Sequence, residues 1–127
     1  MAIASQLAAP AGSTGNNTHQ SVGLSQLAIA VCLEFRVTAV GATPTITYII
    51  QGSLDEVTVD DADSNWVSLL VYPAASDTGT ASPAAVTVVN SFLHYLGSTR
   101  FAKKIRIVTS ANTNVTYEAS VHEFIEG

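Results

Sequence analysis

Apolar and polar side chains alternate at every second residue in three stretches of this 127-residue chain, and this pattern limits the fold more than any other feature. The stretches are residues 29–40, 100–110 and 115–124. In the first stretch, Val31, Leu33, Phe35 and Val37 alternate with Glu34, Arg36 and Thr38. A period of two is typical of a β-strand with one face on a core and the other in water. No stretch combines a 3.6-residue period with helix caps, so the sequence predicts an antiparallel all-β domain.

Two short segments rich in turn-forming residues interrupt these strands. "GATP" occupies residues 41–44 and "ANTN" occupies residues 111–114. Because Gly, Pro and Asn favour turns, we predict that residues 29–51 form a β-hairpin and that "ANTN" turns the chain between two later strands. The surrounding sequences, "RVTAVGATPTITY" and "RIVTSANTNVTY", also resemble each other. Either an ancient duplication or the ordinary chemistry of hairpins explains this similarity, and we favour the second.

The middle of the chain contains further strand candidates. Residues 66–72 are apolar on both faces, which predicts a central strand with Trp66 directed at the core. We expect a low-complexity loop at 73–85, a strand at 85–89, and either a strand or a helical turn at 91–97. A chain of this length forms one domain. The predicted fold is an antiparallel two-sheet β-sandwich spanning residues 28–127.

The N-terminal segment differs from the rest of the chain in its lack of charge. Residues 1–33 contain no Asp, Glu, Lys or Arg, whereas tails that stay in water are usually charged or highly polar. One interpretation is a loosely ordered terminus. The other is an extended arm, residues 1–27, that becomes ordered on a neighbouring protein. Its predicted contact residues are the large apolar ones, Ile3, Leu7, Val22, Leu24 and Leu27.

Composition argues against several classes of protein. The net charge of −5 disfavours nucleic-acid binding, which relies on clustered Lys and Arg. No run of 18 apolar residues is present, so we expect no membrane-spanning helix, and the start "MAIASQLAAPAG" does not have the basic region of a signal peptide. We therefore expect synthesis in a reducing cytoplasm. Cys32 is the single cysteine, which we interpret as a small buried apolar residue without a disulfide partner.

Acidic and basic residues are segregated along the chain. Five of the ten carboxylates are Asp55, Glu56, Asp60, Asp61 and Asp63, and four of the five basic residues are Arg100, Lys103, Lys104 and Arg106. These groups pair within one domain, or they form complementary patches on adjacent subunits that fix orientation. On the second interpretation, the interface residues are Asp60, Asp61, Asp63, Arg100, Lys103, Lys104 and Arg106.

The acidic segment resembles a metal site only in part. "DADSN" matches the first ligands of a calcium loop, but Trp66 and Tyr72 stand where that loop needs Gly and a bidentate Glu. We therefore expect a solvated loop between strands, with no metal and no cofactor.

We found no pattern of a catalytic site in the sequence. The three histidines, His19, His94 and His122, lie in separate segments, and no G-x-S-x-G, Walker A or G-x-G-x-x-G motif is present. Paired carboxylates acting as acid and base need contrasting environments, which a single acidic loop does not provide. The sequence predicts a protein that is not an enzyme, without catalytic residues.

The order of segments resembles a known group of proteins. The uncharged N-terminal segment, "FRVTAVGATPTITYIIQGS", "NWVSLLVYP" and "RFAKKIRIV" together resemble small virion structural proteins of tailed bacteriophages, of which capsid decoration (cement) proteins are the nearest class. The resemblance implies a non-enzymatic protein, made in the host cytoplasm and located on the virion. Its partners would be the major capsid protein or another virion protein and further copies of itself, as in a trimer.

Two alternatives remain open. The first is another virion part, such as a tail-tube, connector or fibre-base subunit. The second is a carbohydrate-binding module, because the same order of segments is similar to discoidin-like sandwiches. The aromatic platform that such modules use for sugars is not evident in this sequence.

Overall fold

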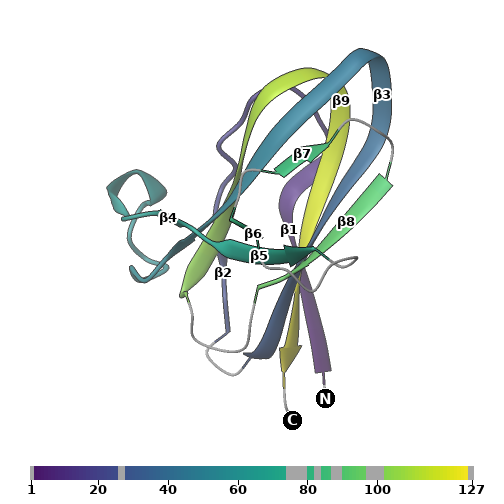
Figure 1. The fold of residues 1–127 in the computed structure, drawn as a ribbon. Coiled ribbons are helices and arrows are strands. Elements are labelled where there is room, and N and C mark those ends of the chain that lie inside the picture. The colour runs from purple at the N-terminus through teal and green to yellow at the C-terminus, as the bar shows by residue number, and fades with distance from the viewer. Residues whose placement is uncertain are drawn as a thin grey trace.

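The computed structural model describes residues 2–25, 28–73, 80–81, 84–86, 90–96 and 102–125 (Figure 1). Its strands are β1 (Ala2–Ser13), β2 (Val22–Gly23), β3 (Ala28–Ser53), β4 (Val67–Ser68), β5 (Leu70–Pro73), β6 (Thr80–Ala81), β7 (Ala84–Val86), β8 (Asn90–Tyr95) and β9 (Lys104–Ile125). A short 3₁₀ helix, η1, spans Asp61–Asp63. The predicted all-β, antiparallel fold is confirmed. Within the described ranges there is no helix with the length and hydropathy needed to cross a bilayer.

The two longest strands, β3 and β9, form the framework of the fold. They pair antiparallel from Ala28 opposite Ile125 to Ser53 opposite Lys104. Both strands bend near their middle, and Figure 1 shows them rising together, arching over and descending together. At the bend the Asn114 side chain donates a hydrogen bond to the Ala42 carbonyl at 2.7 Å. A Cβ on Gly41 would lie 2.9 Å from the Asn114 Cβ, so this close approach requires glycine.

The predicted hairpin at 29–51 is wrong. "GATP" and "ANTN" bend their strands without reversing them, and both halves of β3 pair with β9. Three residues of these segments, Thr43, Ala111 and Asn114, have positive φ angles. These backbone angles bend β3 and β9 at positions that lie beside each other in the sheet. The similarity between the two segments therefore corresponds to two bends that lie against each other.

The N-terminal segment follows β9 on the side opposite β3. β1 pairs with the second half of β9, from Ala2 opposite Ile125 to Ser13 opposite Tyr117. Residues 17–24 continue along the first half, where the Thr109 N–H donates to the Asn17 carbonyl and Val22 lies opposite Ile105. The structure thus shows residues 2–25 as part of the sheet, and it does not show the predicted extended arm. An uncharged segment can pair along its own sheet as readily as along a neighbour's.

The described strands form one open sheet rather than two separate sheets. Its order is β1-β9-β3-β8-β5-β6, with β2 on β9 and with β4 and β7 on β3. The bend brings the two halves of this sheet face to face. The Phe35 ring of one half stacks on the Tyr48 ring of the other, with 3.9 Å between their centroids. The predicted two-sheet sandwich is not shown; its two layers are halves of one folded sheet.

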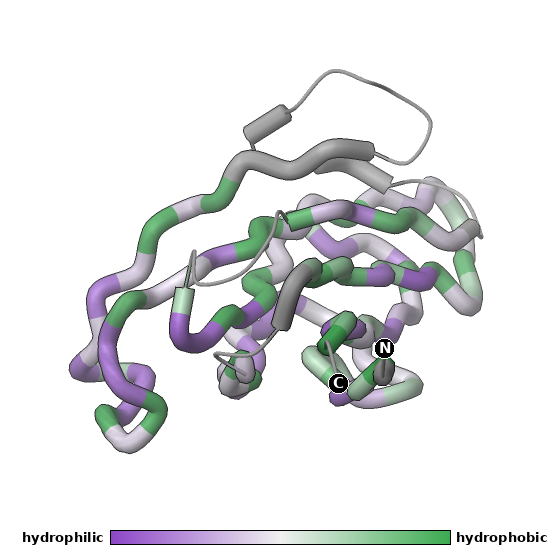
Figure 2. Tube along the Cα trace, turned by 90° about the horizontal axis from the view of Figure 1, so that it is seen from below, coloured by the Kyte–Doolittle hydropathy of each residue, from purple (hydrophilic) through white to green (hydrophobic). Residues whose placement is uncertain are grey.

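The core lies between the two halves and contains the residues selected by the two-residue period. Val31, Leu33, Phe35 and Val37 are buried, as are alternate residues of β9 from Val115 to Val121. Figure 2 shows this alternation of hydrophobic and hydrophilic residues along the strands. Ala39 is exposed, because it lies next to the bend.

The middle of the chain follows the predictions only in part. Residues 91–95 belong to β8, which pairs with β3, so the strand alternative is correct. The predicted strand 66–72 is divided: β4 pairs with the end of β3, and β5 pairs with β8 and β6. The predicted loop 73–85 and strand 85–89 contain β6 and β7 and lie partly outside the described residues.

Candidate interaction surfaces: the outer sheet face and the acidic loop

One face of the sheet formed by β1, β9, β3 and β8 points away from the core. The strand registers align its side chains in rows, such as Ile3, Phe124 and Ala30, or Leu7, Ser120, Glu34 and Leu93. We call this surface the outer face. Its residues are Ile3, Ser5, Leu7, Phe124, His122, Ser120, Ala30, Cys32, Glu34, Tyr95 and Leu93.

Large apolar side chains on the outer face are exposed to solvent. Ile3 is 63% exposed and Leu7 is 62% exposed on β1, and Leu93 and Tyr95 are 45% and 43% exposed on β8. Several exposed apolar side chains on one sheet face are typical of a surface that contacts another protein. The outer face is therefore the first candidate interaction surface.

The structure separates the five residues that the sequence analysis assigned to an interface arm. Ile3 and Leu7 lie exposed on the outer face, whereas Val22 and Leu24 are buried in the core. Leu27 lies outside the described residues. Cys32, which we predicted to be buried, is half-buried on the outer face, where burial raises the pKa of its thiol.

A line of polar side chains crosses the middle of the outer face. Ser5 Oγ is 2.8 Å from Nδ1 of His122, and Nε2 of His122 is 3.8 Å from Oε1 of Glu34. A nucleophile, a base and an acid in this order are the elements of a catalytic triad, and no such arrangement was predicted from the sequence. Ser5 and His122 are far apart in the sequence, and only the pairing of β1 with β9 brings them together.

The geometry of this line does not favour catalysis. The distance between His122 and Glu34 exceeds that of a hydrogen bond, and Arg36 already binds the Glu34 carboxylate at 3.2 Å. Acyl transfer also needs donors directed at a developing oxyanion inside a cavity, and Ser5 is exposed on a sheet edge. We interpret the line as a polar network in which Ser5, His122 and Glu34 serve as partners for each other and for Arg36.

The acidic loop, residues 55–64, is attached to the sheet by a buried lysine. Lys104 is fully buried, and its Nζ donates to the Val59 carbonyl at 2.7 Å and to Ser64 Oγ at 2.6 Å. The same Nζ lies 3.6 Å from the Asp61 carboxylate. Both Asp61 oxygens accept hydrogen bonds from Ser21, from its N–H at 2.9 Å and its Oγ at 2.6 Å. The loop is therefore held from two sides.

These contacts lower the pKa of the Asp61 carboxyl. Burial alone would raise that pKa, but the two hydrogen bonds from Ser21 and the positive charges of Lys104 and Arg106 bring it below its ordinary value. The ionised carboxylate is thus bound by its own chain. Its oxygens are not directed outwards as they would be in the calcium loop that "DADSN" resembles.

Trp66 lies under the acidic loop and not in the core, so the prediction for this residue is wrong. Its indole N–H donates to the Asp61 carbonyl at 2.9 Å, and the Arg106 guanidinium carbon lies 4.1 Å from the ring centroid. An indole needs an acceptor for its N–H, and its face attracts cations. The loop and Arg106 satisfy both requirements at the edge of the fold.

The structure brings part of the predicted charged patches together within one chain. Asp61 pairs with Lys104, and Glu56 pairs with Lys103. Asp60 and Asp63 are exposed, Arg106 stacks on Trp66, and Arg100 lies outside the described residues. Over the described part of the chain, no three His, Cys, Asp or Glu side chains are grouped to hold a metal ion. The acidic and basic segments thus meet at least partly within the domain.

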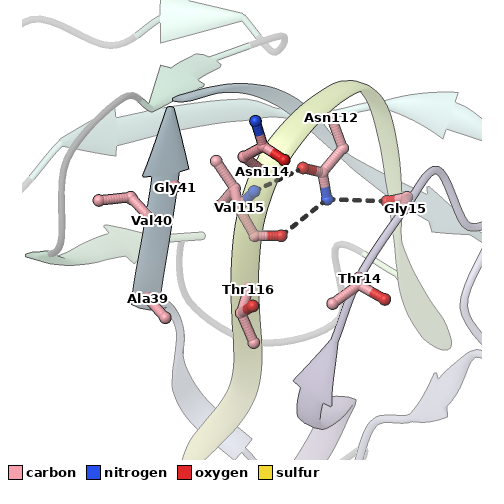
Figure 3. Close-up of a pocket in the computed structure, with 9 residues that line it drawn as sticks. All are labelled: Thr14, Gly15, Ala39, Val40, Gly41, Asn112, Asn114, Val115 and Thr116. Carbon is pink, nitrogen blue, oxygen red and sulfur yellow. Dashed lines mark hydrogen bonds between the residues drawn. The ribbon is translucent and has the colours of Figure 1, made fainter. Parts of the chain in front are cut away.

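A pocket of about 460 Å³, lined by both polar and apolar residues, lies at the bend of β3 and β9 (Figure 3). The side-chain amide of Asn112 donates to the carbonyls of Gly15 and Val115, and its Oδ1 accepts from the Val115 N–H. None of the described residues that line this pocket is charged; they are Thr14, Gly15, Ala39, Val40, Gly41, Asn112, Asn114, Val115 and Thr116. Asn112 therefore stabilises the bend, and the described lining of the pocket contains no acid or base.

A more apolar pocket of about 480 Å³ lies beside the acidic loop. Its lining residues are Gly52, Ser53, Leu54, Asp55, Asn65, Val67 and Leu69. The Asp55 carboxylate accepts hydrogen bonds from the Asn65 N–H at 2.7 Å and from Ser53 Oγ at 3.2 Å, so it serves the loop. Neither pocket includes Ser5, His122 or Glu34.

Two histidines are hydrogen bonded to buried tyrosines. His94 is 3% exposed and its Nε2 is bonded to the Tyr48 hydroxyl, and His19 Nε2 lies 2.6 Å from the Tyr117 hydroxyl. His94 is thus a buried side chain that is hydrogen bonded within the fold. Burial lowers the pKa of both imidazoles, because the charged form is poorly solvated there.

The free energy of unfolding should fall as the pH is lowered from 7.5 to 5. The unfolded chain takes up protons near the ordinary histidine pKa of about 6.5, whereas folded His94 and His19 take them up only at lower pH. Stability is thus fully present above that pKa and is lost as the pH falls below it. Urea titrations at pH 7.5, 6 and 5 measure the loss. The double variant His94→Gln/His19→Gln should lose much less stability over this range, and an unchanged slope would contradict the assignment.

The comparison with known proteins gives a likeness of fold. No family model matches the chain, and no curated protein matches its sequence. Among solved structures, the chain is similar to the SPBc2 prophage-derived protein YomS, with a TM-score of 0.59 and 10% sequence identity. The match covers 96% of this chain and 92% of that chain. At this identity the likeness shows the fold alone, and it extends over nearly the whole length of both chains.

Proposed function

We propose that this chain is a non-enzymatic structural protein of a bacteriophage virion, and that it acts as a decoration protein that binds the capsid shell and stabilises it. The observation that carries the proposal is the outer face, with Leu93 and Tyr95 exposed on the sheet. Its fold is similar to that of a prophage-derived protein, which supports a phage origin. The proposed partner is the major capsid protein or another virion protein.

The physical character of the outer face suits repeated contact with a shell. A sheet face changes shape little on binding, so little conformational entropy is lost. Many copies, each bound modestly, stabilise a shell collectively because all neighbours must detach together. The Ser5, His122 and Glu34 line does not have the geometry of a catalytic centre, which supports a binding role.

The test is the location of the chain in particles of the phage that encodes it. Heads and tails are separated on a density gradient, and the chain is quantified against the major capsid protein by mass spectrometry. We expect a constant ratio in purified heads and a lower temperature of head disruption when the gene is deleted. Recovery in tails alone would replace the decoration role with that of a tail subunit, and absence from both fractions would refute the proposal.

The outer face is tested by adding purified variants to heads that lack the protein. Leu93→Asp places a charge on the outer face, and Leu54→Asp is the matched control, because Leu54 is 69% exposed in the acidic-loop region. We expect Leu93→Asp to reduce occupancy of the heads by more than about tenfold, as when a charge is left unpaired at an interface. Equal occupancy by both variants would show that another surface binds the shell.

A further inference from the structure

β1 is the terminal strand of the sheet, and its outer edge faces no other described strand. An open edge presents N–H and C=O groups that can pair with another chain, and natural proteins usually protect it with charges, prolines or bulges. β1 has no charged residue. Its Pro10 and its irregular registers come after Leu7, so Ala2–Leu7 forms a regular and unprotected edge.

The spacing of the exposed side chains on this edge is self-complementary. Ile3, Ser5 and Leu7 point to the outer face, with Ile3 and Leu7 placed symmetrically about Ser5. Directly opposite residues of an antiparallel pair point to the same face. If two copies of β1 pair about a two-fold axis at Ser5, then Ile3 of each copy lies opposite Leu7 of the other. Such an isologous contact uses the same patch on both subunits.

We propose that the partner of this edge is a second copy of the chain, joined by antiparallel β1–β1 pairing with its two-fold axis at Ser5. The other registers are less favourable. An axis at Ala4 places Ile3 opposite a serine, and an axis at Leu7 places the irregular part of β1 in the contact. An axis at Ser5 uses only the regular segment and covers both exposed apolar side chains.

Charge also favours a second copy at this position. The chain carries a net charge of −5, so two copies repel each other over most approaches. β1 is uncharged, and on the adjoining strands Arg36 pairs with Glu34 and Glu118. Glu123, opposite Ala4 on β9, is buried and accepts hydrogen bonds from the Ser25 N–H and from the Gln6 side chain. Among the described residues, pairing of the two edges therefore brings no exposed, unpaired like charges together. It also joins two outer faces into one wider surface. The dimer does not depend on the proposed binding to the capsid.

The molar mass of the purified protein tests the existence of the dimer. Light scattering should give twice the chain mass of 13.2 kDa. The Ile3→Lys/Leu7→Lys variant should be monomeric, because the register places lysine opposite lysine, and its dissociation constant should rise on the order of 100-fold or more. The control Leu54→Lys/Val67→Lys changes two equally exposed side chains elsewhere and should remain dimeric. Circular dichroism confirms that each variant is folded.

Cross-linking tests the register. Residues opposite each other in an antiparallel pair have Cα atoms about 4.5–5.5 Å apart, within the range of a disulfide. In a Cys32→Ser background, Ser5→Cys should form a covalent dimer under mild oxidation, whereas Val67→Cys should not. A dimer that Ser5→Cys does not cross-link would overturn the Ser5 axis. A monomer at all concentrations, or a dimer unaffected by lysine at both positions, would overturn the proposal even if the protein binds heads.

Discussion

Replacing Lys104 with alanine should lower the free energy of unfolding by about 3 kcal/mol, because the change leaves buried groups without their partner. The Lys104 ammonium donates to the Val59 carbonyl and to Ser64 Oγ and lies beside the Asp61 carboxylate, with no exposure to solvent. Without it, the acidic loop loses its attachment to β9. Urea denaturation followed by Trp66 fluorescence and by circular dichroism measures the effect.

The neighbouring lysine provides a matched control. Lys103 pairs with Glu56 on the surface, and Lys103→Ala should cost less than about 1 kcal/mol. Lys104→Met separates charge from packing: it retains the buried stem, so it should be less damaging than alanine. If Lys103→Ala and Lys104→Ala destabilise the protein equally, then the buried lysine does not hold the loop as we describe.

The sequence predicted the alternating segments of β3 and β9 as strands, but it did not predict β1 or the partners of the strands. The two-residue period identified the core residues Val31, Leu33, Phe35 and Val37, and they are buried. Which strand lies beside each of them was not predictable from that period. Phe35 lies opposite Ala119 on one side and Phe92 on the other, both far away in the sequence. Local patterns report the environment of a side chain and not the identity of its neighbour.

The error at the two bends has a specific cause. A Gly-Ala-Thr-Pro segment can end a strand, reverse it or bend it, since each requires only a few unusual backbone angles. Here the segment bends the strand, and two contacts between β3 and β9 stabilise the bend. Asn114 of β9 donates to the Ala42 carbonyl, and the Thr45 hydroxyl of β3 donates to the Ala111 carbonyl. These contacts exist only after β3 and β9 have paired.

For the candidate surfaces, too, composition identified possible contact residues, but strand pairing decides which of them are exposed. Ile3 and Leu7 were identified as contact residues because they interrupt an uncharged segment, and both are exposed. Val22 and Leu24 were chosen for the same reason but are buried, since residues 17–24 pair with β9. Leu93 and Tyr95 were not identified, because their exposure follows from the position of β8 in the sheet.

Replacing Phe35 with alanine should lower the free energy of unfolding by about 4 kcal/mol, the loss typical of a large cavity in a core. The Phe35 ring is fully buried and nearly parallel to Tyr48 at 3.9 Å, and its centroid lies 5.2 Å from Tyr117. Tyr48 belongs to the other half of bent β3, so this stack joins the two layers of the folded sheet. Its loss removes buried area and an aromatic contact together.

Two further variants show whether the stack itself is responsible. Phe35→Leu retains most of the buried volume and should lose about 1–2 kcal/mol, whereas Val40→Ala, at a 39% exposed position of the same strand, should lose less than about 1 kcal/mol. Urea titrations with coincident circular dichroism and Trp66 fluorescence provide the values. If Phe35→Ala costs no more than Val40→Ala, the two halves of the sheet are held together by contacts other than this ring. If Phe35→Leu and Phe35→Ala are equally destabilised, the geometry of the aromatic stack matters more than the volume it fills.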